Sequence, residues 1–325
     1  MTFDLREFVE WIVRDFEPRV RVDGRAGAYA RTAGGGQVHL YGTADMACIF
    51  YTLDLLPRDE PKRAEWIGIL QSLQDPASGY LAARPADHSV LHNTAFALGA
   101  LNLLGALPRH PLSFAREVSW PEKLVAFLDG LDWRTRVYRD SHDGAGLASA
   151  VALVPGTVGP EWFEAYFAYT DGKFDPANGM MGVGKPACGD TDQVGGTFHY
   201  AFLYEHFRRP IPCPEARTEA ILRLQLPSGN WRDDNPWWLT MDAMYLLDRD
   251  QRRTDHRRPE VRAAMARALA AAVSRLKSED TLRVMTPHTL TAVVSLLAVA
   301  QQFFGGEEIC SPQPLRLVLD RRPFI

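Results

Sequence analysis

The chain has 325 residues, of which 46% are hydrophobic and 23% charged, a composition typical of a globular protein rather than a disordered or fibrous one. Its formal net charge is −4 and its basic residues are scattered apart from one run at 252–258, which excludes a broad nucleic-acid-binding surface. The four cysteines lack C-x-x-C spacing, which argues against a zinc ribbon and against a disulfide framework.

Neither the start of the chain nor any apolar run indicates a membrane-directed segment. Residues 1–14 contain Asp4, Glu7 and Glu10 and so lack the basic and then apolar layout of a secretory signal. The most apolar segment, 289–304, is interrupted by polar residues and is shorter than the roughly 18 to 20 apolar residues that a membrane span needs. We therefore expect a cytoplasmic protein without a membrane span.

Two kinds of helix alternate along the chain. The first kind is amphipathic, begins with 3–16, and elsewhere opens on a Pro-Glu or Glu-Pro pair, at Pro61, Pro121, Pro160, Pro214 and Pro259. Proline and glutamate both suit the first helical turn. The second kind is nearly apolar all round, as expected of a buried helix, and its members are predicted to begin near Asp45, His92, Asp143, Asp192, Asp242 and His288. Strand signals are sparse, the clearest lying at 36–40.

The starts of both kinds of helix recur with a period of about 50 residues, which predicts a repeat architecture. Glycine-containing turns at 75–79, 175–179 and 226–229 repeat with the same spacing, and glycine in such turns takes a positive φ. Six outer and six inner helices predict an all-α protein: a closed (α/α)6 barrel, or toroid, of six helical hairpins around a central cavity. One domain would span 1–325. An open solenoid is the competing architecture, but neither end carries the polar cap that a solenoid needs.

One turn carries a resemblance to a known superfamily. The segment Gln225-Leu-Pro-Ser-Gly-Asn-Trp231 fits the Q-x-x-x-G-x-W turn repeated in terpenoid cyclases and, in degenerate form, in protein prenyltransferase β subunits, and 74–80 is a looser copy. The chain therefore resembles the α/α toroids of that superfamily. The resemblance implies a fold more than a reaction, because the same toroid also carries glycosidases, lyases and sugar epimerases.

The superfamily's active-site motifs are matched only in part. Asp190-Thr191-Asp192-Gln193 resembles the D-x-D-D motif whose middle Asp is the Brønsted acid of class II cyclases, but Gln193 stands in place of the last Asp. No Asp-x-Cys pair matches the zinc site of the prenyltransferases. A cyclase therefore stays open as an alternative, whereas a prenyltransferase is disfavoured.

In a closed barrel the starts of the inner helices surround one end of the cavity, so the polar residues there are expected to converge. His199 follows Asp192 by two helical turns and shares its face. Any single Asp in a first turn is also commonly a helix cap, but recurrence at every inner helix favours a binding site. The predicted catalytic residues are Asp192, His199, Asp143, Asp242 and His92, and the predicted substrate contacts are Asp45, Asp190, Trp237, Trp238, Tyr41, Tyr200 and His288.

Carboxylates, imidazoles and aromatic faces together suit a carbohydrate-like polar ring as substrate. We predict an enzyme that performs acid–base chemistry in the central cavity, as a hydrolase, lyase or epimerase. The alternatives are a terpenoid-cyclase-like enzyme that protonates an isoprenoid with Asp192, and a non-catalytic binding module. A cavity lined in depth by Arg, His and Asp would favour the polar substrate, and aromatic and aliphatic walls would favour the cyclase. No cofactor is predicted; Asp and His clustering permits a divalent metal, but no recognised ligand spacing supports one.

Overall fold

The chain is predominantly helical, as its sequence predicts. The computed structural model describes residues 3–82, 88–183, 188–306 and 308–325. Over these ranges it has fourteen α-helices and one two-stranded parallel sheet, in which β1 (Phe3–Asp4) pairs with β2 (Ile309–Cys310). Among the described residues no helix is both long enough and apolar enough to cross a membrane.

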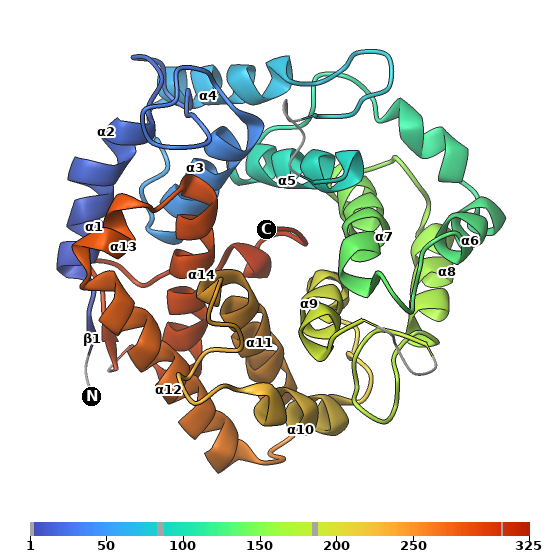
Figure 1. Cartoon of the computed structure of the whole chain (residues 1–325). Helices are drawn as coiled ribbons and strands as arrows, with labels where there is room; N and C mark the ends of the chain where they lie inside the picture. Colours follow the sequence, from blue (N-terminus) through green and yellow to red (C-terminus); the bar gives the residue numbers. More distant parts are fainter. Residues whose placement is uncertain (1–2, 83–87, 184–187, 307) are drawn as a thin grey trace.

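The inner helices surround a common centre (Figure 1). In chain order they are α3 (Leu40–Thr52), α5 (Val90–Leu103), α7 (Val137–Leu153), α9 (Asp190–His206), α11 (Pro236–Gln251) and α14 (Pro287–Phe304). Each contacts the next one along the chain, and α14 contacts α3. Most residues of these helices are buried, which agrees with their apolar sequences.

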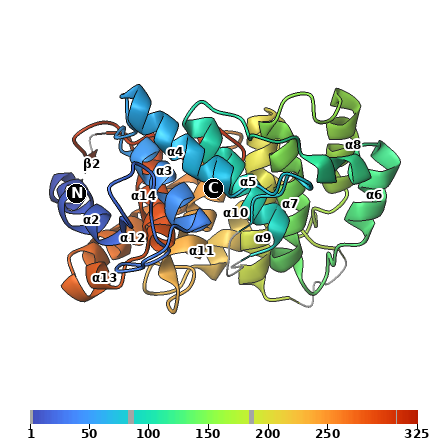
Figure 2. The same ribbon diagram turned by 90° about the horizontal axis from the view of Figure 1, so that it is seen from above.

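The remaining helices lie around the outside of the inner ones, and Figure 2 shows α6 and α8 at one end of the molecule and α2 and α13 at the other. They are α1 (Arg6–Trp11), α2 (Glu17–Val20), α4 (Glu60–Ser72), α6 (Pro121–Asp129), α8 (Pro160–Asp171), α10 (Pro214–Leu224), α12 (Arg258–Leu276) and α13 (Glu279–Arg283). A π-helical turn (Ile12–Phe16) joins α1 to α2, and 3₁₀ turns lie at η2 (Ser113–Val118) and η3 (Val318–Asp320). The predicted proline starts are confirmed, because α4, α6, α8, α10 and α12 each have proline at their first or second position.

Three predicted boundaries differ from the structure. The inner helices begin one to six residues before the predicted starts; α7, for example, begins at Val137 rather than near Asp143. Residues 3 and 4, predicted as helix, are extended because they pair with β2. The predicted strand at 36–40 is wrong: residues 36–39 are irregular and Leu40 begins α3. The His39 side chain caps α3 by accepting a hydrogen bond from the Tyr41 backbone N–H at 3.2 Å.

The predicted glycine turns are confirmed. Gly79, Gly179 and Gly229 have φ values of 83°, 66° and 91°. Each glycine carbonyl accepts a hydrogen bond from a long side chain, namely Gln74 Nε2 at 3.0 Å, Arg217 Nη1 at 2.9 Å and Gln225 Nε2 at 2.8 Å, respectively. The same amide groups of Gln74 and Gln225 also donate to His110 and Ala264 carbonyls, at 2.8 Å in both cases. The glutamine of the repeated turn therefore ties the turn to the chain segment that follows it.

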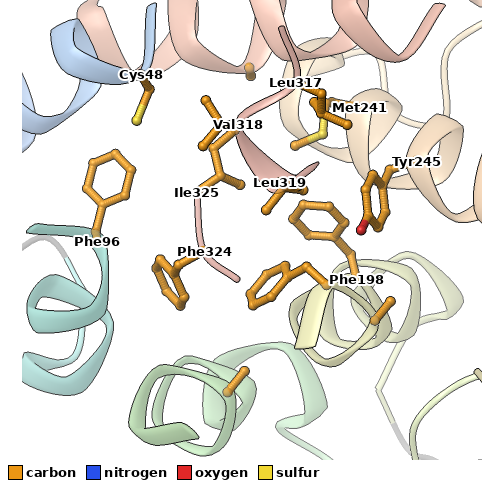
Figure 3. Packing of buried hydrophobic residues seen from close by; sticks show 14 of the residues in the cluster. Cys48, Phe96, Phe198, Met241, Tyr245, Leu317, Val318, Leu319, Phe324 and Ile325 are labelled. Atoms are coloured by element: carbon orange, nitrogen blue, oxygen red, sulfur yellow. The ribbon is translucent and has the colours of Figure 1, made fainter. Parts of the chain in front are cut away.

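The last residues of the chain fill part of the centre (Figure 3). η3 contacts both α3 and α9, and Phe324 lies with its ring centroid 4.9 Å from that of His92 and 5.4 Å from that of Phe202. Arg322 is completely buried and donates a hydrogen bond to Cys48 Sγ at 2.9 Å. Buried apolar side chains from residues 317–325 therefore pack between the inner helices.

Two glycines, Gly79 and Gly105, allow the cost of a positive φ to be separated from the cost of crowding by a neighbouring backbone atom. An added Cβ at Gly79 would lie 2.2 Å from the Pro111 carbonyl oxygen, whereas at Gly105, with φ of 78°, it would meet nothing within 4 Å. We expect Gly105→Ala to lower the free energy of unfolding by about 1 kcal/mol through its backbone conformation alone. Gly79→Ala adds an overpacking cost of about 1–3 kcal/mol. Urea denaturation of both variants measures the difference, and equal losses would contradict the close approach.

Candidate functional site

A cavity with a volume of about 210 Å³ opens among the N-terminal halves of five inner helices, α5, α7, α9, α11 and α14. Most of the residues that line it carry a polar group, namely imidazole, carboxyl, guanidinium, amide or hydroxyl, and they lie beside aromatic and aliphatic side chains. The described residues that line it are His88, His92, Tyr138, Thr191, Asp192, Gly195, Phe198, His199, Arg232, Asn235, Trp238, Leu239, Asp242, His288 and Ile325.

Three histidines from three successive inner helices meet on one side of this cavity. One ring nitrogen each of His92 on α5, His142 on α7 and His199 on α9 lies within 4.8 Å of the other two. The ring centroids are 4.7 Å apart for His92 and His142 and 5.1 Å apart for His142 and His199. All three side chains are buried, and His88 stacks on His142 at 5.0 Å. We call His92, His142 and His199 the histidine cluster.

The hydrogen bonds of His92 determine which of its nitrogens carries the proton. Tyr41 Oη lies 2.8 Å from Asn93 Oδ1, to which it donates, and 2.8 Å from His92 Nδ1. A tyrosine hydroxyl has one proton, so it must accept from His92, whose Nδ1 is then protonated. The lone pair of His92 is consequently on Nε2, the nitrogen that makes no bond to Tyr41.

His199 is held in the same way by a residue of α7. Ser141 Oγ donates to the Tyr138 carbonyl at 2.6 Å and lies 2.7 Å from His199 Nδ1. Since the serine proton is already used, Nδ1 of His199 is the donor and its Nε2 carries the lone pair. In both histidines a neighbouring helix thus fixes the tautomer and the ring orientation.

His142 differs from the other two members of the cluster. Its side chain is only 4% exposed, and neither Nδ1 nor Nε2 has a hydrogen-bond partner among the described residues. Buried polar groups without a partner are uncommon and costly, because the water lost on folding is not replaced. His142 therefore has bonding capacity that the described part of the chain leaves unused.

Burial keeps the cluster uncharged. Loss of hydration lowers the pKa of His142 to about 2, with smaller contributions from His199, His88 and Arg139. Burial likewise lowers the pKa of His199 to about 3, with His88 as the second cause. The pKa of His92 is held well below its usual value by burial and by the neighbouring histidines. At neutral pH the three imidazoles are neutral and can act as bases or as ligands.

The pKa of Asp242 is changed in the opposite direction from the pKa values of the histidines. Asp242 lies on α11, is 4% exposed, and its Oδ1 has no hydrogen-bond partner in the described part of the chain. Burial raises its pKa well above the usual value, which favours the protonated form of the group. Asp192 also lines the cavity but is partly exposed, in the first turn of α9.

Six of the twelve residues predicted for the site line the cavity, and the others do not. The lining residues are Asp192, His199, Asp242, His92, Trp238 and His288. Two further residues lie directly behind the lining: Tyr41, bonded to His92, and Asp45, whose Oδ1 is 3.2 Å from His288 Nδ1 and whose Oδ2 is 3.8 Å from Arg31 Nη1. Their predicted role as direct substrate contacts becomes one of orienting the lining residues.

Four predicted positions lie elsewhere. Asp143 is half-buried outside the lining, because one residue along a helix turns the side chain by about 100° and brings His142 inward instead. Tyr200 faces away from the cavity, with ring centroids 5.4 Å from Trp133 and 6.5 Å from Tyr166 of α8. Asp190 is exposed at the first position of α9, and Trp237 is buried outside the lining.

Sequence reasoning missed several lining residues, of which Tyr138 and Arg232 matter most. Tyr138 precedes His142 by four residues on α7 and so shares its face, a relation visible in the sequence. Arg232 directly follows the Gln225–Trp231 turn and supplies a guanidinium group to the cavity lining.

No family model matches the chain, and neither does a curated protein or a solved structure. The resemblance to the α/α toroids of the terpenoid cyclase superfamily stays a prediction. Function is therefore inferred from the cavity and its side chains.

The buried histidines predict a loss of stability in mild acid. Because their folded pKa values lie below the unfolded value of about 6.5, the unfolded chain binds protons more tightly, and stability falls as the pH drops below about 6.5. A His142→Phe variant lacks this proton acceptor. Between pH 6.5 and 5.5 its free energy of unfolding should therefore fall by about 1 kcal/mol less than that of the native sequence.

Urea denaturation at the two pH values, with a chelator present, measures this. A His110→Gln variant serves as the control, since His110 lies outside the cluster. Identical pH dependence in the His142→Phe variant and the native sequence would contradict the assignment of His142 as a buried neutral base.

Proposed function

We propose that the protein is an enzyme that binds a small, polar, ring-shaped molecule, of the size and character of a sugar or sugar acid, and transforms it by acid–base chemistry in the central cavity. The observation that carries the proposal is the cavity lining, in which histidines from α5, α9 and α14 face Asp192, Asp242 and Arg232. Closely packed titratable groups with displaced pKa values are typical of active sites.

We infer that the architecture is a closed (α/α)6 barrel in one domain. The contact between α14 and α3, together with the contacts between successive inner helices, supports this. The barrel accounts for the convergence of residues that lie far apart in the sequence, since every inner helix except α3 contributes a side chain to the cavity lining from its N-terminal half.

The size of the cavity favours a small polar substrate over an isoprenoid. Its volume of about 210 Å³ lies below the roughly 300–1,000 Å³ typical of sites for drug-sized ligands. Phe324 packs against His92 and Phe202 in the centre, and Ile325 lines the cavity, so the space a long hydrocarbon would need is occupied. Most lining residues carry imidazole, carboxyl, guanidinium, amide or hydroxyl groups, to which a hydrocarbon would offer no hydrogen bond.

The proposed roles follow from the environment of each group. Asp242, kept protonated by burial, donates a proton to the substrate. The base comes from the histidine cluster, as a free imidazole or as a water molecule that the cluster holds. Trp238 and Tyr138 offer aromatic faces to the C–H surface of a ring, and Asp192 and Arg232 bind its polar substituents.

Substitution of Asp242 tests the role of the acid. We expect Asp242→Asn to lower kcat/KM by about 10²–10⁴-fold, the usual loss when a general acid is removed, with no loss of stability because a neutral amide replaces a neutral acid. Asp192→Asn should mainly raise KM. Activity is first sought by absorbance with a panel of 4-nitrophenyl glycosides, for hydrolysis, and with polyuronates, for elimination.

Asp280→Asn, at an exposed position on α13, is the control and should behave as the native sequence does. Thermal shift with the corresponding free monosaccharides and uronic acids reports binding independently of turnover. Undiminished turnover in the Asp242→Asn variant would overturn the role of Asp242, and binding without turnover of any probe would favour a binding module.

A further inference from the structure

We propose that His92, His142 and His199 form a binding site for a single divalent transition-metal ion, with Zn²⁺ as the best match, whose open coordination position faces the central cavity. Imidazole nitrogen is a preferred ligand of zinc, and three histidines plus one exchangeable position are the ligand set of a hydrolytic zinc centre.

The spacing of the ring nitrogens is compatible with one ion bound by all three histidines. One nitrogen of each histidine lies within 4.8 Å of the others. In a tetrahedral zinc site with bonds of about 2.0–2.1 Å, ligand nitrogens lie roughly 3.3 Å apart, so each ring needs to shift by less than about 1 Å. Such a shift is within the reach of small side-chain rotations and needs no movement of α5, α7 or α9.

The hydrogen bonds of His92 and His199 leave one ring nitrogen of each available to bind an ion. Each donates its Nδ1–H to a hydroxyl, Tyr41 Oη at 2.8 Å and Ser141 Oγ at 2.7 Å, which leaves Nε2 with its lone pair. Metal-ligating histidines characteristically donate their other N–H in this way, which fixes the tautomer and increases the basicity of the ligand. Two of the three proposed ligands are thus oriented before an ion binds.

His142 supplies the second, independent observation. It is 96% buried, it lies among the rings of His88, His92 and His199, and neither of its nitrogens has a partner in the described part of the chain. Packing alone would explain the ring contacts but not two unpartnered nitrogens. An ion coordinated by one of them accounts for that unused bonding capacity, and the neutral state of the imidazoles is the state that coordinates a metal.

A bound ion would deepen the proposed function, and this consequence rests on that proposal. His92 and His199 line the cavity, so the open coordination position would face the substrate. Zinc lowers the pKa of a bound water to about 7, which would provide a hydroxide as nucleophile or base, with the released proton passing to the solvent in the cavity. Asp242, protonated on the neighbouring α11, would remain the proton donor.

The test is metal binding by the full chain, stripped with a chelator and then titrated with Zn²⁺ by calorimetry and with Co²⁺ by visible absorption. We expect one ion per chain and the d–d bands of a tetrahedral cobalt centre with nitrogen ligands. Failure to bind either ion, or bands of an octahedral cobalt in water, would overturn the proposal.

Matched variants locate the site. His142→Ala and His199→Gln should each lower the affinity by at least 100-fold, whereas His206→Gln, two turns further along α9 and outside the cluster, should bind as the native sequence does. Tyr41→Phe and Ser141→Ala keep all three ligands but remove the acceptors of the Nδ1 protons, and should lower the affinity by about 10–100-fold. Far-UV circular dichroism checks that each variant is folded. Equal affinity in the His142, His199 and His206 variants would place any bound ion elsewhere.

The two proposals can fail separately. Tight, stoichiometric binding by a chain that turns over no probe would support the metal site and count against the proposed function. Turnover that persists in the chelator-stripped chain would support the function and overturn the catalytic use of a metal.

Discussion

The inner helices surround a centre that must be filled, and this constraint determines much of the structure. The inner helices pack side by side, each against two neighbours, so their inward faces cannot all bury one another. Apolar side chains of residues 317–325 fill part of the centre (Figure 3). A cavity lined mostly by residues with polar groups lies among the N-terminal halves of the inner helices. Helix N-termini favour negative and hydrogen-bond-accepting groups because their backbone N–H groups point outward unpaired. The cavity therefore lies where the unpaired backbone N–H groups of the helix N-termini favour polar ligands.

Contacts between neighbouring inner helices also orient the side chains of the cavity. Tyr41 of α3 orients His92 of α5, and Ser141 of α7 orients His199 of α9. Asp45 of α3 forms a hydrogen bond with His288 of α14. These two helices contact each other although they lie near opposite ends of the chain. Each of these hydrogen bonds joins two inner helices that contact each other, so helix packing and the orientation of these side chains depend on each other. Loss of one contact would change both.

The sequence was most informative about features that depend on local chemistry. Proline at helix starts, glycine in the turns and apolar stretches of helical length predicted the outer helices, Gly79, Gly179 and Gly229, and the buried inner helices correctly. Of the twelve residues predicted for the site, six line the cavity, and the others include neighbours of lining residues on the same helices. Asp143 and His142 are adjacent in the sequence, and only the packing of α7 against α5 and α9 decides which of them faces inward. Tyr200 was misplaced for the same reason, since its side of α9 packs against Trp133 and α8.

Local sequence patterns were enough to predict a helical chain, a repeat of about 50 residues, and acids and histidines near the starts of the inner helices. Those properties follow from interactions within a few residues. The histidine cluster, the buried acid Asp242 and the apolar side chains of residues 317–325 in the centre were decided by tertiary structure. Each joins residues from separate helices, and no local pattern records which faces of two distant helices will meet.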